Sequence, residues 1–424
     1  MTTRGRLARF PQGFLWGAAT AAHQVEGGNH WNDWWEYEQA GRLPYASGDC
    51  CKHFELFDQD FDLARSLGHN CHRFSIEWSR VEPRAGQWND AALRHYGEVI
   101  RSLQQHGLEP VVTLHHFTNP AWFTRNGGWQ QSDAARQFSR FVERSIEHLP
   151  GVRYWITINE PTVLAVQGYI NGEWPPLYRR SWWKAVRVLR NLAAAHLAAR
   201  AAIKKANPGA LVGFAHNAQI TLPCNPRKVR DRFAAHLWDQ WRNRLFFRLL
   251  GCRLGEAAAN ARRLDFIGIN YYTRSFVTTD TFGPSALLGR TCKRAHHPEQ
   301  GPYSMVGWEV FPRGLGSVLD RFSEYGLPLF VTENGIATED DDLRRVFLEQ
   351  HLQVLGESIE SGAPILGYMH WSLIDNYEWS LGTRPRFGLA AVDYATQQRT
   401  PRESARVLQR YATAGRSGGY SDDH

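Results

Sequence analysis

Two short segments of the chain each combine a strand-like apolar run with a glutamate at its end. They are Tyr154–Pro161 and Leu329–Gly335. Each run contains β-branched residues, places Asn beside Glu and is then stopped by Pro or Gly, which is typical of a buried strand that presents one carboxylate at its end. The two glutamates are Glu160 and Glu333. Paired carboxyl groups suit hydrolysis of a glycosidic bond, because one can protonate the leaving oxygen while the other attacks the sugar carbon.

A single glutamate at a strand end is more often a solvated rim residue or a helix cap than a catalytic group, so the surrounding elements matter. The chain alternates strand-like runs with amphipathic or Ala-rich helical stretches. The predicted strands are Phe14–Thr20, Asn70–Trp78, Glu109–Phe117, Arg153–Glu160, Leu211–Asn217, Asp265–Tyr272, Pro328–Glu333 and Gly367–Ile374. The clearest predicted helices are Ala91–His106, Ala134–His148, Trp182–Ala206 and Leu343–Gly362.

Eight β-α repeats without a break in composition predict an α/β fold, a single (β/α)₈ TIM barrel over residues 1–413. The segment Thr278–Glu309 is irregular and predicts a long loop over the mouth of the barrel. The small polar residues 414–424 predict a disordered tail. Active sites of such barrels lie at the C-terminal ends of the strands. Both glutamates fall there, at the ends of the fourth and seventh strands.

Other polar and aromatic residues end or follow the remaining strands. Each taken alone has an ordinary structural explanation: a core ion pair, a solvated loop position or a packed ring. Adjacent strand residues point to opposite faces, so only one of His115 and His116, and one of Tyr271 and Tyr272, should face the mouth. No third ligand accompanies the two histidines, so no metal is expected. The further candidates are Gln24, Arg73, Asn270, Trp371, Glu378 and Trp379.

Composition favours a globular protein that binds small molecules. The formal charge is +7, but the basic residues are scattered, and only six of the 49 are Lys, so a bias toward Arg explains the charge better than a nucleic-acid surface does. The 17 Trp include several near predicted strand ends, where flat apolar rings suit the C–H faces of sugars. We expect neither a nucleic-acid nor a membrane partner.

The six cysteines are sparse and show no C-x-x-C spacing, which predicts free thiols and neither a disulfide framework nor a zinc site. The apolar run near the N-terminus is short and broken by Gly, so it predicts a first strand and not the core of a signal peptide. No run approaches the roughly 18 apolar residues of a membrane span. These features predict a cytoplasmic protein.

Taken together, the motifs resemble those of family 1 glycoside hydrolases, the β-glucosidase-type retaining enzymes. The resemblance extends from Phe10–Gly17 to Arg386–Gly388, which is nearly the whole chain. The most specific parts are Thr157–Pro161 and Val331–Gly335, and they are far more specific together than singly. The resemblance implies hydrolysis of terminal β-D-glucosyl, galactosyl or fucosyl residues in small β-glycosides or oligosaccharides, without a metal or organic cofactor.

The resemblance also implies a role for each candidate residue. Glu160 would be the acid/base and Glu333 the nucleophile, with Asn159 holding the sugar's 2-hydroxyl. Arg73, Asn270 and Tyr272 would position Glu333 and keep it ionised, and Phe387 would close one wall. The remaining hydroxyls and the floor of the sugar site would fall to Gln24, His116, Glu378, Trp379 and Trp371.

Two departures from the family pattern concern specificity. Phe117 stands where the family more often has Trp, which removes an indole N–H donor. The chain is also somewhat short for the family, so the loops that select the aglycone would be trimmed. The intact Glu378-Trp379 pair implies an unphosphorylated sugar, and the presence of Glu160 separates the chain from the plant thioglucosidases.

Three other readings of the sequence stay open. One is a non-catalytic sugar-binding member of the same fold, which the presence of both glutamates disfavours. A second is an endo-acting cellulase-like barrel, and the enclosing Gln24, His116 and Glu378-Trp379 set argues against it. The third is transglycosylation, because the sequence does not fix whether water or a second sugar accepts the glycosyl group. The oligomeric state is also left open.

Overall fold

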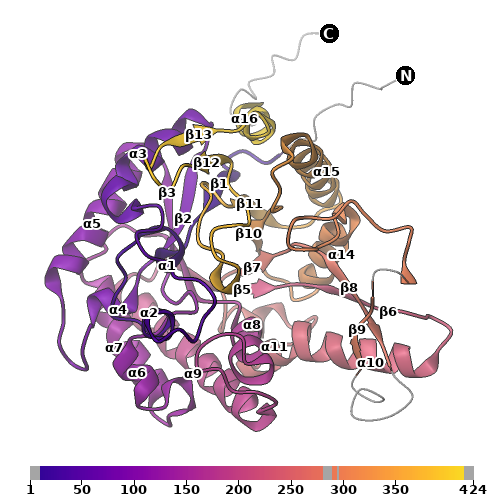
Figure 1. Cartoon of the computed structure of the whole chain (residues 1–424), viewed down its shortest axis with the longest axis horizontal. Helices are drawn as coiled ribbons and strands as arrows, with labels where there is room; N and C mark the ends of the chain where they lie inside the picture. The colour runs from indigo at the N-terminus through magenta and orange to yellow at the C-terminus, as the bar shows by residue number, and fades with distance from the viewer. Residues whose placement is uncertain (1–9, 280–288, 294–295, 415–424) are drawn as a thin grey trace.

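The computed structural model describes residues 10–279, 289–293 and 296–414 of the chain, and its centre is a closed barrel of eight parallel strands (Figure 1). The strand order around the barrel is β1-β11-β10-β7-β5-β4-β3-β2. The strands are β1 (Leu15–Ala19), β2 (Cys71–Ser75), β3 (Glu109–Thr113), β4 (Tyr154–Asn159), β5 (Leu211–Asn217), β7 (Ile267–Asn270), β10 (Leu329–Asn334) and β11 (Ile365–Trp371). All eight predicted strands and the predicted barrel are confirmed.

Helices surround the barrel, and at least one follows each strand in the chain (Figure 1). The principal ones are α3 (His53–Ser66), α5 (Asp90–Gln105), α7 (Ala134–Ile146), α9 (Trp182–Ala206), α11 (Leu245–Leu250), α14 (Pro312–Ser323), α15 (Asp341–Glu360) and α16 (Ala405–Ala414). Local chemistry fixes where these helices begin: the Asn89 side chain accepts hydrogen bonds from the first free amides of α5, and Asp340 does the same for α15.

Shorter elements occupy the connections. The short helices are α1 (Ala22–Val25), α2 (Asp33–Gln39), α4 (Trp78–Val81), α6 (Ala121–Arg125), α8 (Pro161–Val166), α10 (Val229–Asp239) and α12 (Ala257–Asn260), with single turns at Gly128–Gln130, Gln167–Asn171, Gln240–Arg244 and Trp379–Leu381. A two-stranded sheet joins β12 (Ala390–Val392) to β13 (Arg399–Pro401), and a three-stranded sheet has the order β6 (Ile220–Pro223), β8 (Arg274–Thr278), β9 (Arg290–Thr291).

The segment Thr278–Glu309 is less irregular than predicted. Its first residue belongs to β8, and Arg290–Thr291 form β9, which pairs antiparallel with β8. Residues 280–288 and 294–295 of this segment lie outside the described part of the chain, as does the predicted tail apart from Ala414, which ends α16.

The barrel interior changes from apolar to polar along the strands. Apolar side chains pack into a cluster inside the barrel, and most strands contribute one or two of them. The cluster includes Cys71, Val111, Ala215 and Met369. Two residues further along these same strands stand Arg73, Thr113, Asn217 and Trp371. Because side chains alternate with a period of two, each polar or aromatic residue lies on the same side of its strand as the apolar one before it. The strand sequence therefore places the polar layer at the mouth.

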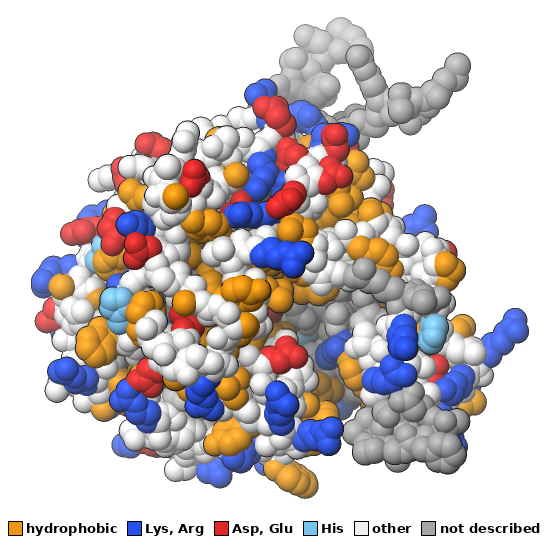
Figure 2. All heavy atoms as spheres, viewed as in Figure 1, with side chains coloured by type: hydrophobic (Ala, Val, Ile, Leu, Met, Phe, Trp, Pro, Cys, Tyr) orange, Lys and Arg blue, Asp and Glu red, His pale blue; other side chains and the backbone are white. Residues whose placement is uncertain are grey.

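The outer surface of the molecule mixes charges of both signs. Figure 2 shows Lys and Arg side chains spread over the face that it presents, with Asp and Glu side chains among them. Within the residues that the structure describes, no helix has the length and apolar character needed to cross a membrane.

Candidate active site

A cavity of about 350 Å³ opens at the C-terminal ends of the barrel strands. Ten of the twelve residues predicted for the site line it: Gln24, His116, Asn159, Glu160, Tyr272, Glu333, Trp371, Glu378, Trp379 and Phe387. The other two, Arg73 and Asn270, are fully buried and hydrogen-bonded to cavity residues. The fold thus brings the whole predicted set together.

The carboxylate of Glu333 is held from two sides. Arg73 donates from Nη1 to Oε1 at 2.5 Å, and the Tyr272 hydroxyl donates to Oε2 at 2.6 Å. The pairing of β10 with β7 shifts register between Val331 and Glu333. A shift of this kind re-aims side chains beside an active site, and here both Thr332 and Glu333 bond to groups inside the barrel mouth.

Arg73 extends across the barrel to reach several strands. Its Nε donates to Thr113 Oγ1 on β3 at 3.0 Å, and its Nη2 donates to Asn159 Oδ1 on β4 at 2.7 Å. Its Nη1 also reaches the Thr332 carbonyl at 3.2 Å, in addition to Glu333. A guanidinium has a planar fork of donors, and here each nitrogen is bonded. The buried charge is therefore paired with one carboxylate and fixed in orientation.

Glu160 occupies a different environment. It caps α8 with a left-handed backbone (φ 42°), and Pro161 takes the first helical position. Its Oε1 accepts hydrogen bonds from Asn270 Nδ2 at 2.8 Å and from Asn217 Nδ2 at 3.0 Å, both of them neutral amides. Burial, followed by the negative charge of Glu333, raises the pKa of Glu160 to about 8, against the lowering effect of these hydrogen bonds. The carboxyl group of Glu160 therefore favours its protonated form at neutral pH.

Asn270 links the two glutamates to one another. Its Oδ1 accepts a hydrogen bond from Thr332 Oγ1 at 2.6 Å. This bond fixes the orientation of the amide, so that its Nδ2 points toward Asn159 and Glu160. The Nδ2 donors reach Glu160 and also Asn159 Oδ1, at 3.1 Å. Asn159 Oδ1 in turn accepts from Arg73. With Glu333, which also bonds to Arg73, these six residues form one continuous network in which neither Asn side-chain amide can turn without breaking a bond.

One end of the cavity carries buried polar atoms that the protein does not satisfy. Gln24 donates from Nε2 to the Tyr377 carbonyl at 2.9 Å and to Glu378 Oε2 at 3.3 Å. Within the described residues, however, the buried Gln24 Oε1 and His116 Nδ1 have no hydrogen-bond partner. Buried polar groups are nearly always paired. Both side chains line the cavity, so these two atoms are available to a polar group placed there.

Glu378 is a third carboxyl group of the cavity. Burial raises its pKa to about 8, and the charges of Glu333 and Glu160 act in the same direction, while hydrogen bonds from Trp371 and Gln24 lower it. His116 shows the opposite effect. Burial and the nearby Arg73 charge hold the pKa of its imidazole well below the usual value, so this ring is neutral.

Aromatic rings form much of the remaining wall. His116 is nearly parallel to both Trp371 and Trp379, with interplanar angles of 13° and 12°. Phe387 packs against Tyr272 on the other side, with ring centroids 6.2 Å apart. Phe117 lines the cavity with a left-handed backbone (φ 73°). A cavity with flat apolar faces and a few buried polar atoms suits a sugar ring, whose C–H faces and hydroxyls need both.

The two pairs of adjacent residues divide as strand alternation predicts. His116 lines the cavity, whereas His115 bonds to Asn119 Oδ1 at 3.0 Å and packs against Trp129. Tyr272 bonds to Glu333, whereas the Tyr271 hydroxyl donates to the Phe311 carbonyl at 2.7 Å. The histidine pair is therefore not a shared ligand set.

Sequence reasoning missed several cavity residues. Asn217, which donates to Glu160, ends a predicted strand, and its position there was a usable signal. Trp308 and Val306 line the cavity from the loop that precedes α14, and Trp174 lines it from the loop after α8. These lie in connections without a regular pattern, so no periodicity pointed to them.

The prediction that all six cysteines are free thiols is wrong for one pair. The structure joins Cys224 and Cys292 by a disulfide, while Cys50, Cys51, Cys71 and Cys252 are free and buried. The two partners are 68 residues apart in sequence. Only the pairing of β6, β8 and β9 brings them together, so their spacing in the sequence carried no signal.

The structure is a (β/α)₈ barrel with a cavity that contains two carboxyl groups, one paired with a guanidinium and one bonded to neutral amides. Comparison with known proteins places this barrel and cavity in a family of enzymes. The family model described as glycosyl hydrolase family 1 matches residues 6–263 and 254–416. A β-glycosidase from Pyrococcus horikoshii of known structure is 40% identical, with a TM-score of 0.88 over 97% of this chain and 96% of that chain.

Two curated relatives show the range of substrates within this group. Beta-glucosidase A of Thermotoga maritima is 30% identical over 94% of this chain and 96% of its own length. A 6-phospho-beta-galactosidase of Lacticaseibacillus casei is 31% identical over the same shares of the two chains. The chain belongs to glycosyl hydrolase family 1, and it is an enzyme of the β-glycosidase type.

The electrostatic link between the two glutamates can be measured by titration. The Glu333→Gln variant removes one negative charge and leaves Arg73 positive, so the pKa of Glu160 should fall below about 8. Because burial is the larger cause, it should stay above the ordinary value of 4.5. The side-chain ¹³C shifts of labelled glutamates report both values, and Glu82, whose pKa burial also raises, serves as an internal reference. An unchanged or increased pKa of Glu160 would contradict the assigned coupling.

Proposed function

We propose that the protein is a retaining exo-β-glycosidase that hydrolyses terminal, non-reducing β-D-glucosyl residues, with galactosyl and fucosyl residues as further candidates. The proposal rests on one observation: two buried carboxyl groups in one cavity have different hydrogen-bond partners and different charges beside them. Glu333 is paired with a guanidinium, whereas Glu160 is bonded only to neutral amides and has its pKa raised to about 8. Glycosidases need this division between a carboxylate and a carboxylic acid.

In the first step, Glu333 attacks the anomeric carbon while the glycosidic C–O bond breaks. Glu160 gives its proton to the departing oxygen, so the aglycone leaves as a neutral alcohol. Arg73 and Tyr272 hold the attacking carboxylate in place from behind. The product of this step is a glycosyl ester of Glu333 and an ionised Glu160.

In the second step, water or a sugar hydroxyl takes the place of the aglycone. Once Glu333 is esterified, its negative charge is gone, and the pKa of Glu160 falls because that charge was one of the causes raising it. Glu160 then accepts a proton from water, which attacks the anomeric carbon and releases Glu333. Two displacements at the same carbon retain its configuration.

The terminal sugar would lie at the end of the cavity formed by Gln24, His116 and Glu378. Its hydroxyls would pair with Gln24 Oε1 and His116 Nδ1, the buried atoms left unsatisfied. Trp371 would stack under the ring, and Asn159 would hold the 2-hydroxyl from the strand that also bears Glu160. A site closed at this end accepts a chain terminus and not the middle of a polysaccharide, which supports exo action.

The lining of the cavity supports an unphosphorylated sugar. In the described part of the chain, the lining includes four glutamates, Glu160, Glu173, Glu333 and Glu378, and no Lys or Arg. Proteins hold a bound phosphate mainly through cationic side chains, so we separate this chain in substrate from the 6-phospho-specific relative. We also propose a cytoplasmic location: four buried cysteines are free, and in a reducing compartment the Cys224–Cys292 pair would be reduced as well.

The assigned roles predict different behaviour for the two glutamate variants. Glu333→Ala should abolish turnover of p-nitrophenyl β-glucoside without unfolding the protein. Glu160→Ala should lower kcat/KM by roughly 10²–10⁴ for substrates with poor leaving groups, spare those with good ones, and regain rate with azide, which needs no base to attack the glycosyl-enzyme.

Glu109→Ala is the matched control for these variants. Glu109 is a half-buried glutamate at the N-terminal end of β3, opposite the mouth, and burial also raises the pKa of its carboxyl. This variant should keep its activity and show no response to azide. If Glu160→Ala slows all substrates equally and azide restores nothing, the acid/base role is wrong.

Substrate choice gives a separate test. Rates for p-nitrophenyl β-glucoside, β-galactoside and β-fucoside should each exceed that for the 6-phosphoglucoside at equal concentration, by at least about 100-fold, since an unpaired buried phosphate costs several kcal/mol. A 6-phosphoglucoside that reacts as fast as the glucoside would show that the proposed sugar class is wrong while leaving the carboxylate roles intact.

A further inference from the structure

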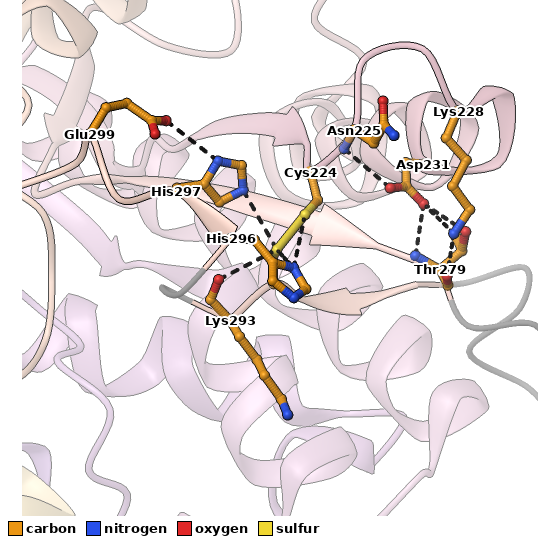
Figure 3. The surroundings of a disulfide bond; sticks show 10 residues. Cys224, Asn225, Lys228, Asp231, Thr279, Lys293, His296, His297 and Glu299 are labelled. Carbon is orange, nitrogen blue, oxygen red and sulfur yellow. Dashed lines mark hydrogen bonds and ion pairs between the residues drawn. A yellow bond between two sulfur atoms is a disulfide. The ribbon is translucent and has the colours of Figure 1, made fainter.

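A second cluster of chemically reactive side chains lies outside the cavity, on the three-stranded sheet. Cys224, labelled in Figure 3, directly follows β6. Cys292 directly follows β9. The sheet fixes both backbones, because the Cys224 amide donates to the Val277 carbonyl and the Cys292 amide to the Phe276 carbonyl, each at 2.8 Å. The two sulfur atoms are joined in the structure.

Two consecutive histidines face these sulfur atoms (Figure 3). His296 Nδ1 lies 3.1 Å from Cys292 Sγ and 3.5 Å from Cys224 Sγ. His297 Nε2 lies 3.5 Å from Cys292 Sγ. The ligand atoms of Cys224, Cys292 and His296 all lie within 4.8 Å of one another. A disulfide has no polar requirement that would draw two imidazoles to it.

The three nitrogen–sulfur distances, 3.1–3.5 Å, are close to the edges of a metal tetrahedron. His297 lies outside the group of three whose ligand atoms are all within 4.8 Å, and the two sulfur atoms are bonded, so the cysteine pair must separate on reduction and the His297 ring must shift to complete the site. With Zn–S bonds of about 2.3 Å and Zn–N bonds of about 2.0–2.1 Å, neighbouring sulfur and nitrogen ligands of a tetrahedral zinc ion lie about 3.6 Å apart. Two thiolates and two imidazoles are a ligand set of structural zinc sites. We propose that Cys224, Cys292, His296 and His297 form a Cys₂His₂ site that binds Zn²⁺ when the cysteine pair is reduced.

The surroundings of His297 also suit a metal ligand. Its other ring nitrogen, Nδ1, lies 3.6 Å from Glu299 Oε1, and a metal-bound histidine commonly turns its second N–H toward a carboxylate. The ring is buried and stacks on Phe276, with centroids 4.0 Å apart. Packing therefore orients the ring with Nε2 toward Cys292 Sγ.

Zinc binding at this site balances without a redox change in the metal. A thiol reductant first supplies the two electrons and two protons that convert the Cys224–Cys292 bond into two thiols. Zn²⁺ then displaces one proton from each thiol, both protons pass to solvent, and the two imidazoles bind as neutral ligands. The protein fills all four positions, so the site is closed to substrate and its role is structural. This assignment replaces the sequence-based expectation that the chain binds no metal, and it does not depend on the proposed glycosidase mechanism.

The position of the cluster connects it to the active site through the backbone. Asn217 ends β5, Gln219 lies in the short link from β5 to β6, and Tyr272 and Thr273 lie in the link from β7 to β8; all four line the cavity. Zinc bound to Cys224 and Cys292 would link the segments that follow β6 and β9. It would thereby stabilise the wall that holds Asn217 against Glu160 and Tyr272 against Glu333.

The test is the metal content of the full chain, produced with added zinc and purified under a thiol reductant. Mass spectrometry of the metals should find about one zinc per chain. Cys224→Ser and His297→Ala should each lose most of it, while Cys252→Ser and His236→Ala keep it. Cys252 is a buried free thiol, and His236 is an exposed residue of α10, so they match the two ligand types.

Replacement of zinc by Co²⁺ gives a second readout. The intact protein should show the intense d–d absorption of tetrahedral cobalt and a thiolate charge-transfer band, and Cys292→Ser should lose that band. The His296→Ala and His297→Ala variants keep both cysteines. If a cysteine variant does not fold, loss of zinc from these two histidine variants still tests the proposed ligand set. Absence of zinc from the reduced protein, or equal zinc in ligand and control variants, would overturn the proposal and leave the pair as a plain disulfide.

Discussion

The buried guanidinium of Arg73 is the interaction on which the rest of the site depends. It is fully buried, bonds to residues on β3, β4 and β10, and forms an ion pair with the carboxylate of Glu333. Removing one partner of a buried ion pair costs about 3–5 kcal/mol, because the other charge is left uncompensated. Arg73 therefore holds a carboxylate beside it, and the negative charge of that carboxylate is what, together with burial, keeps Glu160 protonated. The two glutamates differ in protonation because the Arg73 cation is bonded to Glu333 and not to Glu160.

The barrel supplies this arrangement through strand geometry. Parallel strands deliver their last residues to a single edge, so side chains distant in sequence meet without any local motif. Both glutamates also follow a register shift, between Ile156 and Asn159 on β4 and between Val331 and Glu333 on β10. A perfectly regular strand would turn adjacent residues to opposite faces. The shifts let neighbouring residues, Asn159 and Glu160, take part in the same network.

Much of this architecture could be predicted from the sequence. Apolar β-branched runs predicted all eight barrel strands, and the bounds of Trp182–Ala206 agree with those of α9. Residue alternation correctly separated His116 from His115. The register shifts could not be predicted, since they depend on pairing between strands. Asn217 was missed because its bond to Glu160 is a long-range contact, and the Cys224–Cys292 pair was missed because only the small sheet brings the two residues together.

The most direct test of the account is to trap the glycosyl-enzyme. A 2-deoxy-2-fluoro-β-glucoside should glycosylate the enzyme and then leave it slowly, since the fluorine destabilises the cationic transition states of both steps while a good leaving group keeps the first step fast. Digestion and peptide mass spectrometry should then find the sugar on the peptide that contains Glu333. A label on any other residue, or β-glucoside turnover that gives an inverted product without any label, would contradict the central claim.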